Sequence, residues 1–505
     1  MKQLRLEGDR EDARNRPNFN PTSSPLALGI LAGFTAVLGG VILAFGGPIA
    51  GLAVLIGGVA TILVLRNVEW GFFGVIVVVT LLPFATLPVD IGLTPTFLDL
   101  ALGAAILVWL LGIVSGQQTR LVTAPVVLPL ILFMLVAVFA FIFGLANGPL
   151  TGTLLRKFAE LLLSLGFVIV ILDYCRTWLR LERLVKFLLL MGAAAAAIAI
   201  GLWLLPEDTT NNLLNMLTRL GYPGGWVIRY IEENPELSER AIGTSVDPNS
   251  LGGLLLMIGA LAGPQLVAKQ PLFSRKLTWV IFGLVFIGLI LTFSRGAMVG
   301  LVAGLGFVAV VRYRRLLPFL IFAGLLLLFL PVAQAYIGRF IEGFQGADLA
   351  TQMRFGEYRD ALTLIGRYPV FGVGFAGAPD IDLYLAVASV YLTIAGRMGL
   401  LGLVVFFLLV GTVFSYAFIH RRLAQVDEQI GPVWLGLHAA LAGALVAGLF
   451  DHYLFNMDFH HAVTIFWMIL GMASAATRLA TEKALVDRPT DKNQNSHLNP
   501  EFADL

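Results

Sequence analysis

Residues 354–375 read RFGEYRDALTLIGRYPVFGVGF and form the centre of a polar interruption that runs from about Ile337 to Ile381. Apolar stretches long enough to cross a bilayer lie on both sides of it. A chain that lies mostly in lipid has few places for aqueous chemistry, and this interruption is the largest one between its apolar stretches. We therefore expect this segment to face away from the cytoplasm and to cover the site at which the protein works.

The composition is that of a membrane protein. The 505 residues are 58% hydrophobic and 13% charged, and their mean hydropathy is +0.86, whereas about a quarter of the residues in ordinary globular proteins are charged. Lipid permits only helices or closed barrels, and these runs are continuously apolar instead of alternating. We predict an all-α polytopic integral membrane protein with about 12–14 transmembrane helices and a large extracytoplasmic loop. The net charge of +2 gives no reason to expect a nucleic-acid partner.

About fourteen windows have the hydropathy of a membrane span. In chain order they are Leu26–Phe45, Pro48–Leu65, Trp70–Leu87, Thr96–Val114, Val122–Leu145, Leu155–Tyr174, Leu184–Leu205, Ser250–Val267, Leu277–Phe293, Gly296–Val311, Leu316–Tyr336, Leu383–Phe418, Trp434–Leu449 and Ala462–Ala476. The window Leu383–Phe418 is too long for one simple span, so we expect its first part to be re-entrant or tilted.

Basic residues in the short loops indicate the orientation, because such loops are enriched in lysine and arginine on the cytoplasmic side. With the N-terminus inside, the clusters that fall in the cytoplasm include Arg176, Arg180, Arg183 and Lys186, then Lys269, Arg275 and Lys276, and then Arg312, Arg314 and Arg315. We predict cytoplasmic tails at residues 1–24 and 481–505 and a transmembrane domain at 25–480. Its outer excursions lie at about 206–249, 337–382 and 451–461.

Arg295 lies in LTFSRGAMVGLVAG, where one apolar run stops and another begins. A cation at this place could extend its head group to the membrane surface. Alternatively, it faces a cavity and binds an anion such as a phosphate, because the planar guanidinium stays charged and grips oxyanions with two hydrogen bonds. Gly296 and Gly300 would let a neighbouring helix approach closely.

Arg354 opens the stretch quoted above. On a helix, Arg354, Tyr358, Ala361 and Leu362 share one face, whereas Arg359 lies towards another. That helix either lies solvated on the membrane or binds an anion. The following PVFGVGF predicts a tight turn, because proline ends the helix and glycine permits positive φ.

A third polar segment, ERAIGTSVDPNSLGGLLL, leads into a span. Asp247 or Asn249 is expected to cap that helix, and a contact from Asn249 to a substrate hydroxyl is the alternative. Asp99 and Glu160 lie in or near apolar spans, where acids are costly unless they are paired or face a cavity. The sequence assigns these two acids no role.

Three of the six histidines, His452, His460 and His461, cluster in the last outer loop near Asp451 and Asp458. Histidine can act as a general base near neutral pH. Interfacial hydrogen bonding is the simplest alternative; a metal site is another, although the spacing does not match a helical ligand pair such as His-Glu-x-x-His. Nucleotide-binding and Ser/His/Asp signatures are absent from the sequence, and no cofactor or metal is expected.

Four segments between about Arg240 and Phe407 resemble the O-antigen ligase and polymerase family of bacterial membrane proteins. They are RAIGTSVDPNSLGGLLL, LTFSRGAMVGLV, RFGEYRDALTLIGRYPVFGVGF and SVYLTIAGRMGLLGLVVF. The likeness implies a type C glycosyltransferase-like fold in the bacterial inner (cytoplasmic) membrane. It further implies a role in cell-envelope polysaccharide or lipopolysaccharide biosynthesis. The donor would be a glycan on a polyprenyl carrier such as undecaprenyl diphosphate, and the acceptor a lipid A core, another glycan or a protein.

The resemblance places the family's arginines at Arg295 and Arg354, where they would hold the diphosphate leaving group. Ser294, Arg359 and Asn249 in the matching motifs are further candidates for substrate contacts. Such a donor is already activated, so the implied glycosyltransferase is metal-independent. The arginines would stabilise the departing charge, while a base takes the proton of the acceptor hydroxyl.

One position departs from the family pattern. Family ligases carry a His, followed by Asn, Ser or Gln, about three helical turns before the Gly of Gly-Leu-Leu-Gly; Gly399 is that Gly here, and the pair reads Ala388–Ser389. Either His452, His460 or His461 replaces the base, or the protein is a polymerase-like relative with another mechanism, or it is an inactive membrane scaffold. A lipid-linked glycan flippase is a further class, which the paucity of charges in the middle of the spans argues against.

Overall fold

A computed structural model of the chain describes residues 63–64, 66–87, 94–116, 120–318, 349–377 and 387–486. The predicted spans Leu26–Phe45 and Pro48–Leu65 lie outside the described residues, apart from the last few positions of the second. Most of Leu316–Tyr336, the tail at 1–24 and most of the tail at 481–505 lie outside them as well.

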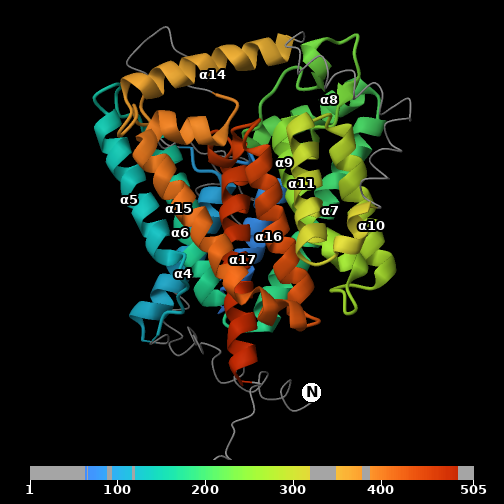
Figure 1. Ribbon diagram of the computed structural model, residues 1–505. Coiled ribbons are helices and arrows are strands. Elements are labelled where there is room, and N and C mark those ends of the chain that lie inside the picture. Colours follow the sequence, from blue (N-terminus) through green and yellow to red (C-terminus); the bar gives the residue numbers. More distant parts are fainter. Residues whose placement is uncertain are drawn as a thin grey trace, which may run out of the picture.

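Long apolar helices form a bundle (Figure 1). They are α3 (Glu69–Leu81), α4 (Phe97–Val114), α5 (Val127–Gly144), α6 (Gly152–Tyr174), α7 (Trp178–Leu204), α9 (Pro248–Val267), α10 (Arg275–Leu291), α11 (Arg295–Val311), α15 (Val390–Val426), α16 (Ile430–Ala447) and α17 (His460–Val486). Within the described residues, seven helices are long and apolar enough to cross a membrane: α4, α5, α7, α9, α15, α16 and α17. The predicted all-α polytopic membrane protein is confirmed. The total of about 12–14 spans stays a prediction, because several of them lie outside these residues.

Shorter elements lie at the ends of the bundle. Between α7 and α9 come α8 (Glu207–Met216), η2 (Leu217–Leu220), β1 (Arg229–Tyr230), η3 (Ile231–Glu233), β2 (Glu239–Arg240) and η4 (Gly243–Ser245). β1 and β2 pair antiparallel, with Arg229 opposite Arg240. The other elements are η5 (Arg314–Leu316), α14 (Leu349–Arg367) and η6 (Tyr453–Phe455). α14 lies across the top of the bundle in Figure 1, and we call this end of the molecule the α14 end.

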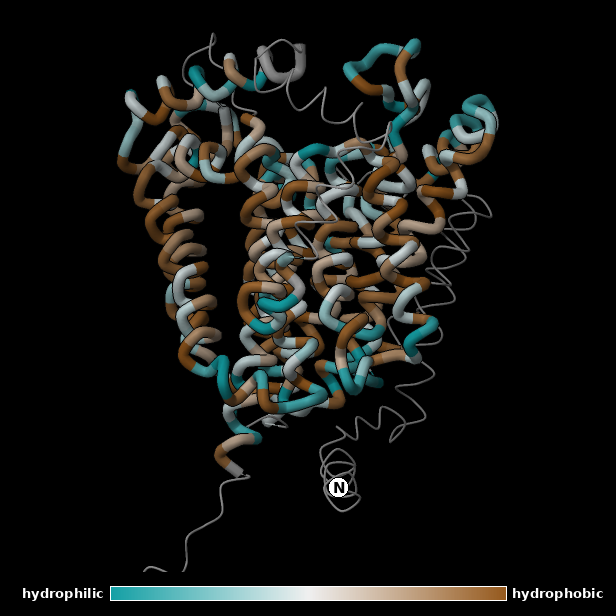
Figure 2. The backbone as a smooth tube through the Cα atoms, turned by 45° about the vertical axis from the view of Figure 1, so that its right-hand side comes forward, coloured by the Kyte–Doolittle hydropathy of each residue, from teal (hydrophilic) through white to brown (hydrophobic). Residues whose placement is uncertain are grey.

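Hydropathy divides the bundle into layers. Figure 2 shows hydrophilic residues gathered at the two ends and hydrophobic residues predominating along the helices between them. α4 and α5 expose large apolar side chains on their outer sides, among them Leu107, Leu128 and Leu135. Water would disfavour such a surface, whereas hydrocarbon accepts it. The arrangement therefore fits a protein embedded in a bilayer.

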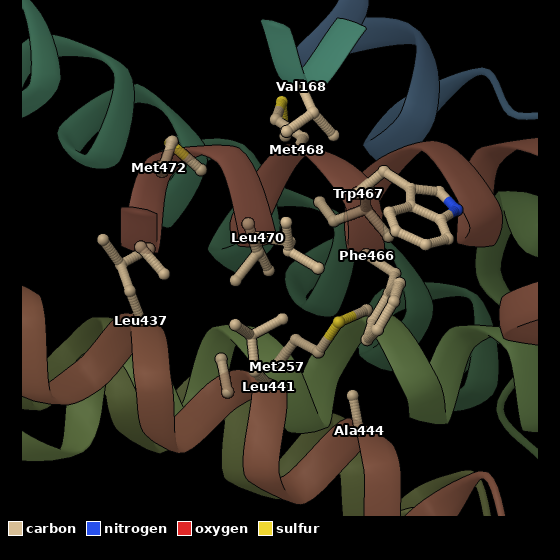
Figure 3. Close-up of a cluster of buried hydrophobic side chains, with 14 of the residues drawn as sticks. Val168, Met257, Leu437, Leu441, Ala444, Phe466, Trp467, Met468, Leu470 and Met472 are labelled. Carbon is tan, nitrogen blue, oxygen red and sulfur yellow. The ribbon is translucent and has the colours of Figure 1, made fainter. Parts of the chain in front are cut away.

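α17 is the central helix of the bundle, and its apolar segment is entirely buried. In Figure 3, Trp467 and Met468 of α17 lie in a cluster with Val168 of α6, Met257 of α9 and Leu441 of α16. A helix that is apolar all round is stable only inside such a core. α17 thus fixes the positions of the helices that surround it.

α11 and α16 approach each other closely through glycines. A Cβ atom on Gly300 would lie only 2.7 Å from the carbonyl oxygen of Gly443, and one on Gly304 would lie 2.8 Å from that of Ala439. Small residues of this kind allow helix backbones to touch in a membrane. The close helix approach predicted at Gly300 is confirmed, and it holds the start of α11 against the end of α16.

α15 consists of two helices joined at a kink. Gly399 has φ 71° and ψ −178°, which a helix does not contain, and the first part of α15 runs across the bundle before the second part descends (Figure 1). The PVFGVGF turn fits against this kink, with Leu400 N donating to Pro369 O at 2.7 Å and Val373 N donating to Gly396 O at 2.9 Å. Both the two-part span and the turn agree with the sequence expectation.

Candidate functional site

Five segments that are distant in sequence meet at the α14 end. They are residues 240–250, 292–297, 354–358, 387–390 and 447–453. The charged and hydroxyl side chains among them that influence one another electrostatically are Arg240, Asp247, Arg354, Tyr358 and Asp451, and we call these five residues the arginine cluster. The resemblance motifs supply all of these segments except the last.

Arg240 is the best-anchored cation of the arginine cluster. It ends β2, and its guanidinium donates from Nε to Thr292 O at 2.8 Å and from Nη2 to Asn249 Oδ1 at 2.7 Å. Both acceptors are neutral, so the bonds orient the group without cancelling its charge. Burial lowers the pKa of Arg240, and the charges of Asp247 and Asp451 act in the opposite direction. Arg240 lies in the third polar segment of the sequence, and its role there becomes visible only in the structure.

Two acids lie close to Arg240. Asp247 caps α9, its Oδ1 accepting from Ser250 N at 2.6 Å, which confirms the first of the two caps expected. Burial raises the pKa of Asp247, and the charge of Asp451 raises it further. Asp451 is buried, and its Oδ1 accepts from the backbone N–H of His452 at 2.8 Å. Neighbouring acids that compete for one arginine are typical of functional sites.

α14 brings Arg354 to the same place. Arg354 lies one helical turn before Tyr358, and its charge lowers the pKa of both Arg240 and Tyr358. Tyr358 Oη donates to Ala388 O at 3.0 Å and lies 3.2 Å from Leu449 O. Because α14 is bonded in this way to the start of α15 and the end of α16, Arg354 has a fixed position over the cluster.

Arg295 begins α11 beside these segments. Thr292, three residues earlier, carries the carbonyl that Arg240 binds. Gly296, one residue later, would place a Cβ atom 3.3 Å from Cβ of Phe450, the neighbour of Asp451. Ser294 is buried in the same turn, and its N–H donates to Thr292 Oγ1 at 3.2 Å. The start of α11 and the middle of α14 therefore both contact the segment 447–451.

The three outer histidines point to different places. His461 is buried, and its Nε2 lies 2.6 Å from Ser250 Oγ. His452 is partly exposed, and its Nδ1 lies 3.8 Å from Asp451 Oδ1. Of the three, His452 is thus the one directly beside an acid of the arginine cluster.

His460 belongs to a separate ion network, which we define as Asp99, Arg156, Glu160 and His460. His460 Nε2 lies 2.7 Å from Glu160 Oε2, and Arg156 Nη1 lies 3.1 Å from the same oxygen and 3.3 Å from Asp99 Oδ2. Thr96 Oγ1 donates to Glu160 Oε1 at 2.8 Å. The two acids that had no role in the sequence argument are therefore paired, as acids near apolar spans must be.

The other sequence candidates lie at the edge of the site. Arg359 is on the exposed face of α14. Ala388, at the position of the family's histidine, donates its N–H to Glu357 Oε2 at 3.0 Å and accepts from Tyr358. Within the described ranges, no three His, Cys, Asp or Glu side chains gather as metal ligands.

Residues 280–407 match the model of a family described as O-antigen ligase. This segment, about a quarter of the chain, is similar to the O-antigen ligase family. The match includes Ser294, Arg295, Arg354, Arg359 and the Ala388 position, whereas Arg240 and Asp451 lie outside it. No curated protein matches the chain.

Proposed function

We propose that this protein transfers a glycan from a polyprenyl-diphosphate carrier to an acceptor hydroxyl at the outer face of the bacterial inner membrane. The observation that carries the proposal is that the segments holding Arg240, Arg354 and Asp451 meet. Arg240 donates to Thr292 O and Asn249 Oδ1, and Tyr358, one helical turn after Arg354, donates to Leu449 O, two residues before Asp451. Asp247 and Asp451 already act on Arg240, and a diphosphate is a further anion that two guanidinium groups can bind together. The similarity of residues 280–407 to the O-antigen ligase family supports the same substrate class.

The reaction requires one bond to form and one to break. The acceptor oxygen attacks the anomeric carbon, and the bond from that carbon to the diphosphate oxygen breaks, leaving its electron pair on the polyprenyl diphosphate. Arg240, Arg354 and Arg295 would stabilise the negative charge that develops on the departing diphosphate. The acceptor proton passes to a carboxylate or an imidazole.

We favour Asp451 as the group that takes this proton. His461 and His460 lie against Ser250 and Glu160, so neither imidazole is directed at the arginine cluster. Asp451 acts on Arg240, Asp247 and Tyr358, so it lies beside the arginines that would bind the diphosphate. His452, whose ring lies next to Asp451, is the alternative base.

Ligase and polymerase share this chemical step and differ in the acceptor, so the arginine cluster supports both. The test is a transfer assay with purified full-length protein, a polyprenyl-diphosphate glycan and candidate acceptors. We expect Arg240→Ala and Arg354→Ala each to slow transfer by about 10²–10³-fold, as loss of one group that stabilises a developing charge does elsewhere. Asp451→Asn should slow it by about 10²–10⁴-fold, whereas His452→Ala should have a smaller effect.

Arg219→Ala is the matched control, because Arg219 is an exposed arginine at the same end of the molecule. It should transfer at the wild-type rate. The proposal is wrong if Arg240→Ala and Arg354→Ala proteins purify normally and transfer as fast as this control. An inactive wild-type protein that still binds the donor would instead indicate a scaffold.

A further inference from the structure

A basic hollow lies at the end of the molecule opposite α14. It has a volume of about 570 Å³ and is lined by Val267, Val311, Arg312, Tyr313, Arg314 and Arg315. These residues come from the ends of α9 and α11 and from η5. The volume is within the range of roughly 300–1,000 Å³ that small-molecule sites occupy.

Several cations at this end are neutralised by acids of the chain itself. Lys269 Nζ lies 2.8 Å from Glu428 Oε1, Arg183 Nη1 lies 3.3 Å from Glu69 Oε2, and Lys483 pairs with Asp427. The three arginines of the hollow differ. Among the described residues none of them forms an ion pair, although Arg314 Nε donates to Val310 O at 3.1 Å. Three positive charges thus face a concave surface without an acidic counterpart there.

A helix C-terminus accounts for part of this arrangement. The last carbonyls of α11 carry partial negative charge, which favours cations next to them. That effect is confined to the last turn, however, and does not explain why the cations surround a hollow with an apolar wall. Val267, almost half exposed, and Val311 form that wall at the ends of two membrane-embedded helices.

We propose that this hollow binds the head group of an anionic phospholipid. Arg312, Arg314 and Arg315 hold the phosphate, because guanidinium groups bind phosphate oxygens in pairs. The acyl chains leave the hollow past Val267 and Val311 along the bundle. Basic pockets between transmembrane helices bind anionic head groups in this way. The apolar wall favours a lipid over a free phosphate, which would leave that surface in water.

The test is native mass spectrometry of the full-length protein in a neutral detergent. The probes are phosphatidylglycerol as the anionic lipid, phosphatidylcholine as the neutral one and glycerol 3-phosphate as the free head group. We expect phosphatidylglycerol to bind and the other two to bind at least tenfold more weakly. Each arginine near an anionic lipid contributes about fivefold to affinity, so Arg312→Gln/Arg314→Gln/Arg315→Gln should bind phosphatidylglycerol about 100-fold more weakly.

The matched control is Arg66→Gln/Arg421→Gln/Arg422→Gln, which removes the same charge at the same end of the molecule and outside the hollow. It should bind phosphatidylglycerol like the wild type. Equal loss in both triple variants would show that only the net charge matters and would overturn the site. Equal binding of glycerol 3-phosphate and phosphatidylglycerol would show that the hollow recognises the phosphate alone, and would contradict the proposal of a lipid ligand.

If the triple variant fails to fold, the single variants Arg312→Gln and Arg315→Gln serve instead. Each should weaken binding about fivefold, and no change in either would contradict the proposal. The hollow and the arginine cluster lie at opposite ends of the bundle. Lipid binding therefore tests the hollow without depending on glycan transfer, so the failure of one proposal can be distinguished from the failure of the other.

Discussion

The ion network and the arginine cluster both lie at the α14 end, but they treat the charges of their members in opposite ways. In the ion network, Glu160 contacts Arg156, His460 and Thr96, so its carboxylate is satisfied within the protein. In the arginine cluster, the guanidinium of Arg240 donates hydrogen bonds to neutral oxygens of Thr292 and Asn249. The first arrangement neutralises charge, whereas the second orients a cation and leaves its charge to act on something else.

This difference indicates that the ion network stabilises the fold, whereas the arginine cluster is suited to binding a ligand. Removing one member of a buried ion pair leaves the other charge uncompensated, which is expensive. Arg240 donates its hydrogen bonds to neutral oxygens, so its removal leaves no hydrogen-bonded carboxylate behind and should affect a bound anion more than the fold. The two groups should therefore respond to mutation in opposite ways.

Glu160→Gln should have the largest effect on stability. Its side chain is only 1% exposed, and the change removes the charge shared by Arg156 and His460. We expect a loss of about 3–5 kcal/mol of unfolding free energy, with little change in the transfer rate per folded molecule. Thermal unfolding of the purified protein, together with the transfer assay, measures both.

Glu236→Gln, at an exposed acid of the segment between α7 and α9, is the control and should change neither quantity. A Glu160→Gln protein of normal stability that has lost transfer would reverse the comparison. It would make His460 a member of the catalytic machinery, as one of the sequence hypotheses holds.

Gly253→Ala should have the next largest effect. An added Cβ atom would lie 2.1 Å from the ring of Tyr453, which follows Asp451 by two residues. Overpacking of this kind costs about 1–3 kcal/mol, and displacement of Tyr453 would also move Asp451. We therefore expect both the melting temperature and the transfer rate to fall. Gly283→Ala, where nothing lies within 4 Å of the added atom, should change neither.

Features of the site that depend on neighbouring residues could be predicted from the sequence. The cap at Asp247 follows from an aspartate directly before Pro248 at the first turn of a helix. The division of α15 follows from an apolar run too long for one span, and the turn after α14 follows from its proline and glycines. Each of these is decided by one continuous stretch of the sequence.

Contacts between distant segments could not be predicted. Arg240 is fixed by Thr292, and His461 by Ser250, across 52 and 211 positions of sequence. His460 and His461 are neighbours in sequence, yet successive residues of a helix point about 100° apart, so they reach different partners. Their neighbouring positions alone do not predict that the two histidines have different partners.

The face of α14 was only partly predicted. Arg354, Tyr358, Ala361 and Leu362 were predicted to share one face, but Ala361 is buried, Leu362 is 61% exposed, and Leu364 is buried. The prediction that Leu362 shares a face with Ala361 is wrong, because neighbouring residues of a helix point about 100° apart. The contact of α14 with α15 decides this, and the helix period alone does not.

Tyr358→Phe should have a smaller effect than either change above. The hydroxyl bonds α14 to Ala388 O, so its loss should cost about 0.5–1.5 kcal/mol and loosen α14 over the arginine cluster. Hydrogen exchange should show faster opening of α14, and the KM for the donor should rise more than kcat falls. Tyr368→Phe is the control, because the hydroxyl of Tyr368 has no hydrogen bond within the described residues. If the hydrogen-exchange rate of α14 were the same in both variants, the hydroxyl of Tyr358 would not be what holds α14 in place.

The smallest effect concerns pH and the strand that carries Arg240. Burial raises the pKa of Glu239 to about 7, and the nearby charge of Glu207 adds to the rise. The ordinary value is 4.5, so between pH about 4.5 and about 7 the folded strand holds a proton that the unfolded chain releases. The stability of the strand pair should therefore be highest below pH 4.5, fall as the pH rises to about 7, and then level off.

Hydrogen exchange of residues 206–249, corrected for the intrinsic rate, measures this dependence at several pH values. Glu239→Gln should make the protection nearly independent of pH over that interval, because it removes the group that titrates. Glu233→Gln, at an acid on the solvent side of the same excursion, should leave the dependence as it is. Protection that instead rose with pH in the wild type would mean that the folded strand favours the charged carboxylate. Arg240 would then have an acidic partner next to it in the chain, and its charge would no longer distinguish the arginine cluster from the ion network.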